Sequence, residues 1–157
     1  MAFMRKAGSA AVVSLAALLA GVNASAQESA PADKAANTGK FVTCVTEGVR
    51  GAFRQAFHTE SRKTIAPGKE RAVIRNVIVR QETSGISASC MSRVSGIPLD
   101  KMPSVNDEQR FPIFYRTHFE EKAFDEVLQA VGKMMPSIEE EGLKILKRKA
   151  GQKAALP

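Results

Sequence analysis

The sequence predicts a small exported α+β domain that is braced by one disulfide. Three observations point to this class: an apolar leader that ends in a small-residue cleavage motif, two cysteines in the remainder, and apolar patterns that change from helical to β-rich and back. The expected order is an N-terminal helix, a β-hairpin or short antiparallel sheet, an irregular connection and two C-terminal helices on one sheet face.

Residues 1–26 have the features of a cleaved signal peptide. Arg5 and Lys6 precede an uncharged stretch of small and apolar residues, and Ala24-Ser25-Ala26 offers the pattern that a signal peptidase cuts. The apolar stretch is shorter than the roughly 20 residues that span a bilayer, which disfavours a retained anchor. We therefore expect a periplasmic or secreted protein that is not transmembrane after cleavage.

The rest of the chain divides into a flexible polar segment, residues 27–40, and a single globular domain, residues 41–157. A domain of this size buries only a modest core, so a covalent brace is useful. In an oxidising compartment Cys44 and Cys90 are expected to form a disulfide. Closing the loop between residues 44 and 90 would stabilise the fold by about 4 kcal/mol in the chain-entropy model. Redox or nucleophilic chemistry is disfavoured, because neither cysteine has a Cys-x-x-Cys motif or an adjacent cation.

The predicted elements follow from the spacing of apolar residues. Residues 41–58 repeat them every three or four positions, which predicts a helix. Residues 71–81 concentrate β-branched side chains and predict a strand, and residues 83–85 predict a hairpin loop. A second strand is expected from alternation with polar neighbours, its inward face carrying Ile86, Ala88, Cys90 and Val94. The disulfide would then pin the first helix to this hairpin.

Residues 96–119 are expected to be irregular because three prolines interrupt them. Within this connection the apolar segment 111–115 predicts either a third short strand or a segment folded over the core. Residues 120–135 show helical spacing. Pro136 is expected to end that helix, and Ser137 and Glu140 predict a capping box that starts a last helix over residues 138–150.

The chain is basic, with 23 Lys and Arg against 16 Asp and Glu. Such an excess attracts an acidic protein or an anionic membrane surface, although solvated faces that aid solubility remain the alternative. In the last helix the helix dipole also accounts for much of the charge pattern. Nucleic acid is not expected, given the predicted export, the single Tyr and the lack of Trp. The predicted partner-binding residues are Arg50, Arg54, Lys144, Lys147, Arg148 and Lys149.

Two His-x-Glu pairs, at His58 and His118, are the only imidazole and carboxylate pairings of this kind in the sequence. Brought together they would resemble a transition-metal ligand set, and either histidine alone would suit a general base. No nucleophile elbow or phosphate-binding glycine loop accompanies them. We therefore assign no catalytic residue, metal or cofactor.

The predicted function is that of an exported non-enzymatic accessory or binding protein of the bacterial periplasm. It would act through protein contacts in envelope maintenance, secretion or interaction with a host. Two alternatives stay open: a small hydrolase or metal-dependent enzyme that uses His58 or His118, and a stress chaperone that exposes residues 111–115 on partial unfolding.

Overall fold

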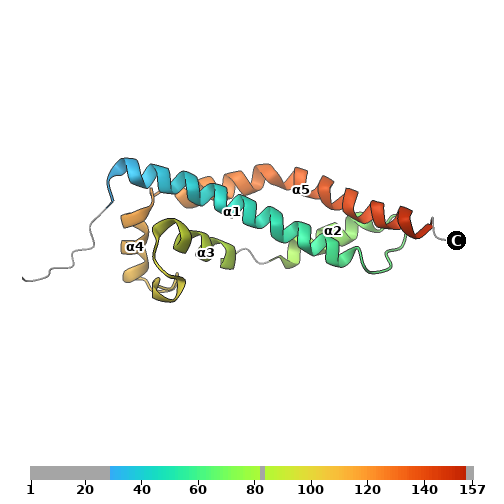
Figure 1. Cartoon of the computed structure of the whole chain (residues 1–157), viewed down its shortest axis with the longest axis horizontal. Helices are drawn as coiled ribbons and strands as arrows, with labels where there is room; N and C mark the ends of the chain where they lie inside the picture. Colours follow the sequence, from blue (N-terminus) through green and yellow to red (C-terminus); the bar gives the residue numbers. More distant parts are fainter. Residues whose placement is uncertain (1–28, 82–83, 155–157) are drawn as a thin grey trace, which may run out of the picture.

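The computed structural model describes residues 29–81 and 84–154, and the regular structure in these residues is helical (Figure 1). The predicted α+β fold is wrong, because these ranges contain no strand. The predicted signal peptide, residues 1–26, lies outside them. The elements are α1 (Pro31–Glu60), α2 (Glu70–Arg80), α3 (Ser84–Ser95), the short 3-10 helix η1 (Leu99–Lys101), α4 (Arg110–His118) and α5 (Ala123–Ala154).

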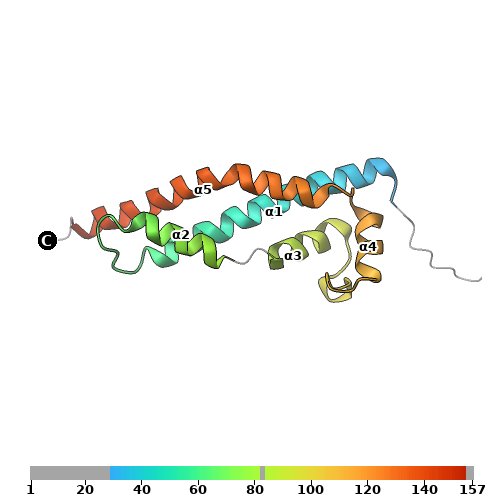
Figure 2. The same cartoon turned by 180° about the vertical axis from the view of Figure 1, so that it is seen from behind.

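Helices α1 and α5 lie side by side and run parallel along the length of the molecule (Figures 1 and 2). Phe41 near the start of α1 contacts Phe124 near the start of α5, and Phe57 near the end of α1 contacts Gly142 further along α5. Helices α2 and α3 follow one another along the other side of this pair, and α4 lies at the end where α1 begins. The largest interface is the one between α1 and α5. The molecule is therefore an elongated helical pair with shorter helices packed against it.

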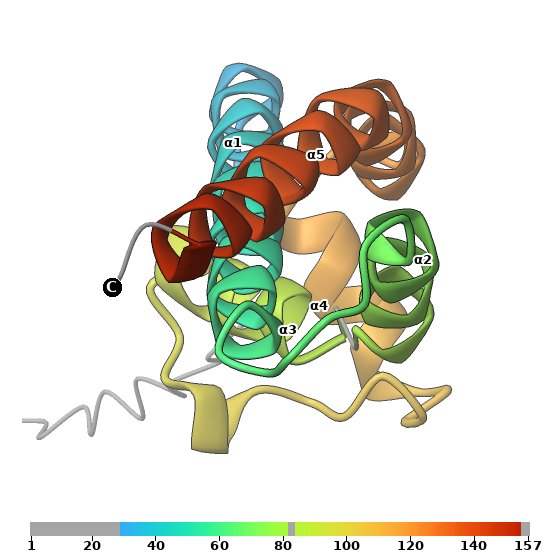
Figure 3. The ribbon, with the colours of Figure 1, turned by 90° about the vertical axis from the view of Figure 1, so that its right-hand side faces the viewer.

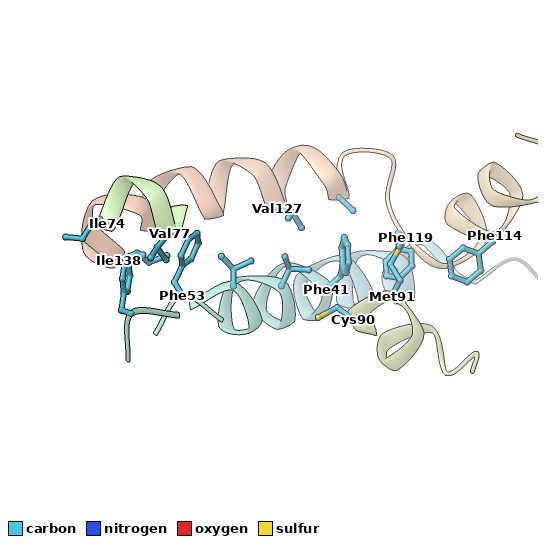
Figure 4. Close-up of a cluster of buried hydrophobic side chains, with 14 of the residues drawn as sticks. Phe41, Phe53, Ile74, Val77, Cys90, Met91, Phe114, Phe119, Val127 and Ile138 are labelled. Atoms are coloured by element: carbon cyan, nitrogen blue, oxygen red, sulfur yellow. The ribbon is translucent and has the colours of Figure 1, made fainter. Parts of the chain in front are cut away.

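The core follows one stripe of α1, in which an apolar side chain recurs at every fourth position. Figure 4 shows this stripe meeting side chains from α5, α2 and α3. The stripe consists of Phe41, Val45, Val49, Phe53 and Phe57. Its buried partners include Ala123, Val127, Ile138 and Leu146 of α5, Ile74 and Val77 of α2, and Cys90 and Met91 of α3.

The first predicted strand, residues 71–81, is helix α2 instead. Its β-branched residues also fit a helical pattern, because the pairs Val73–Ile74 and Val77–Ile78 recur four positions apart. A strand would place Val77 and Val79 on one face, whereas Val77 is 6% exposed and Val79 is 84% exposed. Packing against α5 and α1 therefore overrides the β propensity of this segment.

The second predicted strand is also a helix, α3. Cys90 and Met91 are both buried, although adjacent residues of a strand point to opposite faces. The disulfide between Cys44 and Cys90 is confirmed, with the two Cα atoms 5.8 Å apart. It joins α1 to α3, so it pins a helix to a helix rather than to a hairpin.

Helix α1 begins at Pro31, so most of the segment expected to be flexible, residues 27–40, is helical. Proline suits the first turn of a helix because its missing N–H would be unpaired there. Thr38 is buried, and its hydroxyl oxygen accepts a hydrogen bond from the Glu120 N–H at 3.0 Å. This contact ties the start of α1 to the segment between α4 and α5.

The predicted break at Pro136 is wrong, because α5 continues through it and no capping box starts a new helix at Ser137. Proline removes one backbone hydrogen bond and crowds the preceding turn, which bends a helix. Figure 3 shows α5 changing direction along its length. Burial of Ile138 and Leu146 beyond the proline keeps the second part of the helix packed. Residues 111–115 are likewise part of α4 rather than a strand.

Candidate functional site

The predicted partner-binding cations lie on the two long helices. Arg50 and Arg54 project from α1, and the others belong to the second half of α5. The side chains of Arg50, Arg54, Lys144, Lys147 and Arg148 are all exposed. Lys149 belongs to α5, but its side chain lies outside what the structure describes.

Two of these cations form intramolecular ion pairs on the surface. The Arg54 guanidinium is 2.7 Å from the Glu141 carboxylate and links α1 to α5. The Lys144 ammonium is 2.7 Å from Glu140, one turn earlier in α5, and lowers the pKa of that carboxyl group through a hydrogen bond. Such pairs on the surface add little to the stability of the fold, because solvent and salt screen them. Their larger effect is to neutralise these two charges locally.

The other predicted cations whose side chains the structure describes lack such a partner. In the described part of the chain, no carboxylate pairs with Arg50, Lys147 or Arg148. Lys147 and Arg148 extend from the last turns of α5. Arg50 belongs to a different surface, on the exposed side of α1.

Three shallow depressions adjoin one another on that side of α1, and Glu47 lines all of them. One lies between α1 and α5 and includes Arg50 and Lys133. The other two lie between α1 and α3 and include Arg93, and one of them also includes Lys40. We call the surface formed by Lys40, Glu47, Arg50, Arg93 and Lys133 the Glu47 face.

The Glu47 face is strongly unbalanced in charge. Its four cations come from three helices, whereas Glu47 is the one acidic residue that lines these three depressions. All five side chains are exposed, and none has an ion-pair partner among the described residues. Unpaired cations around one carboxylate leave a positive potential over the surface, which attracts acidic groups.

A close helix contact positions the α3 wall of this face. A Cβ atom on Gly48 of α1 would lie 2.6 Å from the Ile86 methyl carbon of α3, so only glycine permits this approach. The Cys44–Cys90 disulfide joins the same two helices and lines the two depressions beside α3. The contact and the disulfide together hold Arg93 beside α1.

Three of the four cations of the Glu47 face are not among the residues that the sequence predicts, and neither is Glu47 itself. Lys40 fell in the segment expected to be flexible, Arg93 in a predicted strand, and Lys133 on the charged face of a helix with no assigned neighbour. Their convergence depends on how α1, α3 and α5 pack. The only local signal was the unusual number of basic residues near Arg50.

The structure does not bring the two histidines together. His58 is exposed in the last turn of α1. The His118 carbonyl oxygen accepts a hydrogen bond from the Asn37 amide at 3.1 Å, near the start of α1. Asn37 and His58 are about 30 Å apart along α1, at 1.5 Å per residue. The two histidines therefore lie near opposite ends of this helix. Residues 29–81 and 84–154 contain no group of three or more His, Cys, Asp and Glu residues arranged for a metal.

His118 itself lies at an aromatic end of the molecule. Its ring centroid is 5.1 Å from that of Phe114, and partial burial lowers the pKa of the imidazole. Tyr115 stacks on Phe124 with centroids 5.0 Å apart, and burial raises the pKa of its hydroxyl. Phe114 is buried as well. The aromatic residues of segment 111–115 therefore contribute to packing, while Ile113 remains 56% exposed.

The chain matches no protein-family model, no curated protein sequence and no solved structure. Among the helices of the described residues, none has both the length and the apolar character required to cross a bilayer.

Proposed function

We propose that this chain is an exported, non-enzymatic binding protein that contacts an acidic partner through its basic surface. The proposal is supported most directly by the pairing of the predicted binding cations, because some of them have an intramolecular carboxylate partner and others do not. Arg54 and Lys144 are neutralised by internal carboxylates, whereas Arg50, Lys147 and Arg148 have no such partner in the described chain. The unpaired cations are the ones available to another molecule.

The physical role of these charges is to guide and orient the encounter. Exposed cations without counterions attract an acidic surface over about one Debye length, which is about 8 Å at physiological salt. Complementary charge mainly raises the association rate and selects the partner. We therefore expect affinity to fall as salt concentration rises.

Periplasmic or secreted location is part of the same proposal. It is supported by the leader motif in residues 1–26 and by the disulfide between Cys44 and Cys90, which is a bond typical of oxidising compartments. Contacts in envelope maintenance, secretion or host interaction would all suit a protein of this kind.

The experiment compares two sets of captured proteins. Two baits are incubated with an envelope extract. One is the oxidised protein beginning at Gln27, and the other is its variant Lys147→Gln/Arg148→Gln/Lys149→Gln. The protein retained only by the wild type is then purified and titrated at several salt concentrations. We expect an acidic partner, weaker binding by the variant and a shallower salt dependence.

Lys144→Gln is the matched control, because it lies on the same helix but is already paired with Glu140. It should retain the captured partner with nearly wild-type affinity. Salt-independent binding by the wild type, or selective capture of basic proteins, would rule out the proposal.

A further inference from the structure

We infer that the Glu47 face is a docking surface for an acidic segment of a protein, and that Glu47 sets the register by accepting one basic residue of that segment. The inference depends on the proposed function, because it requires an acidic partner. It goes further by naming the surface and the charge pattern that fits it.

The depressions form a continuous surface along α1. They begin at Ala35 and end at Arg50, a distance of about 22 Å along the helix at 1.5 Å per residue. This length suits four turns of a partner helix. The α1 residues that line the first of these depressions include Ala36, Gly39 and Thr43, which are exposed and whose small side chains leave room for a second backbone.

The cations are spread over this length. Lys40 and Arg50 mark two positions along α1, while Arg93 and Lys133 stand on the flanking helices α3 and α5. A segment lying along α1 thus meets positive charge on both sides. Several Asp or Glu residues on one face of such a segment would complement it.

Glu47 distinguishes a protein segment from an anionic lipid surface. A membrane presents anionic headgroups across the whole contact and would repel a carboxylate at its centre. Glu47 stands where the three depressions meet and has no ion-pair partner in the described residues. An acidic segment with one Lys or Arg at this point satisfies both the cations and Glu47.

The test uses two synthetic helical peptides of 15 residues that differ at one central position. Both carry Glu along one face, and the centre of that face is Lys in the first peptide and Glu in the second. General attraction to a basic protein favours the second peptide, which is more acidic. The Glu47 face should prefer the first by roughly fivefold, the upper range for one exposed ion pair.

The variant Glu47→Gln should lose this preference or reverse it. The control Glu139→Gln removes one exposed carboxylate of α5 outside the depressions and should keep it. A wild type that prefers the all-acidic peptide would overturn the inference. So would equal preferences of wild type and Glu47→Gln.

Matched cation variants locate the binding surface. Arg50→Gln and Arg54→Gln change the same charge on α1, and Lys133→Gln and Lys144→Gln do so on α5. Arg50→Gln and Lys133→Gln should each weaken binding of the Lys-centred peptide about fivefold. The other two remove cations that are already paired and should change it less than twofold.

Two outcomes separate this inference from the proposed function. If only Lys147→Gln/Arg148→Gln/Lys149→Gln weakens binding of the captured partner, the Glu47 face is not the docking surface and the proposed function stands. If the wild type captures no acidic protein, the proposed function fails, whatever the peptides show. Binding to vesicles of phosphatidylglycerol that Arg50→Gln and Lys133→Gln abolish would assign the face to lipid and overturn the inference.

Discussion

Phe57 of α1 packs directly on Gly142 of α5. A Cβ atom on residue 142 would lie 2.8 Å from both Cε2 and Cζ of the Phe57 ring. Non-bonded carbon atoms in proteins do not approach one another so closely. Phe57 is 1% exposed and stacks on Phe53, with centroids 6.2 Å apart, so its ring has little room to move. The contact between the two long helices at this point therefore depends on glycine at position 142.

We expect Gly142→Ala to destabilise the protein by about 1–3 kcal/mol, the usual cost of overpacking a core. This loss should exceed the gain of up to about 1 kcal/mol that alanine offers in a helix. Urea unfolding followed by circular dichroism measures the net change.

Gly132→Ala is the control on the same helix, because no neighbouring atom would meet a Cβ there. It should leave stability unchanged or raise it by up to about 1 kcal/mol. Equal effects of the two substitutions would show that the Phe57 contact does not limit the helix approach.

Removal of the Cys44–Cys90 disulfide should lower stability by about 2–4 kcal/mol. The bond joins residues 46 positions apart, and its loss allows the unfolded chain more conformations. Oxidised wild type and Cys44→Ser/Cys90→Ser are compared by urea unfolding.

Reduced wild type separates the bond from the side-chain change, since Cys90 is buried and serine is more polar. Reduction alone should reproduce most of the loss. The same unfolding midpoint before and after reduction would contradict a stabilising role for the bond.

Acidification should weaken the fold through His118. Partial burial lowers the pKa of the folded imidazole below its ordinary value of 6.5, so the unfolded chain takes up a proton more readily. The contribution of His118 is therefore fully present above about pH 6.5 and is lost as pH falls through that value towards the folded pKa. Thermal unfolding between pH 7.5 and 5.5 should show this fall in wild type and a smaller one in His118→Gln.

His58→Gln serves as the comparison, because His58 is exposed at the other end of α1. It should keep most of the wild-type decrease. If His118→Gln and wild type lose stability equally over this range, the titration of His118 does not contribute.

Local patterns succeeded where one residue's neighbours in sequence are also its neighbours in space. The apolar repeat from Phe41 to Phe57 identified the buried face of α1, whereas the pair Cys44 and Cys90, 46 positions apart, followed from the count of cysteines and not from a local pattern. They failed over α2, where β-branched residues suggested a strand although Ile74 and Val77 were spaced for a helix. Pro136 likewise failed as a stop signal, because packing on both sides of it offsets one lost hydrogen bond.

The sequence by itself determined the excess of basic residues, the pairing of the two cysteines and the apolar stripe of the first helix, since these depend on composition and short-range spacing. Only the tertiary structure decided which cations are neutralised and which converge. Arg54 meets Glu141 across two helices, whereas Lys40, Arg50, Arg93 and Lys133 gather around Glu47 from three. Charges far apart in sequence interact only at the distances that helix packing sets, and no local pattern encodes those distances.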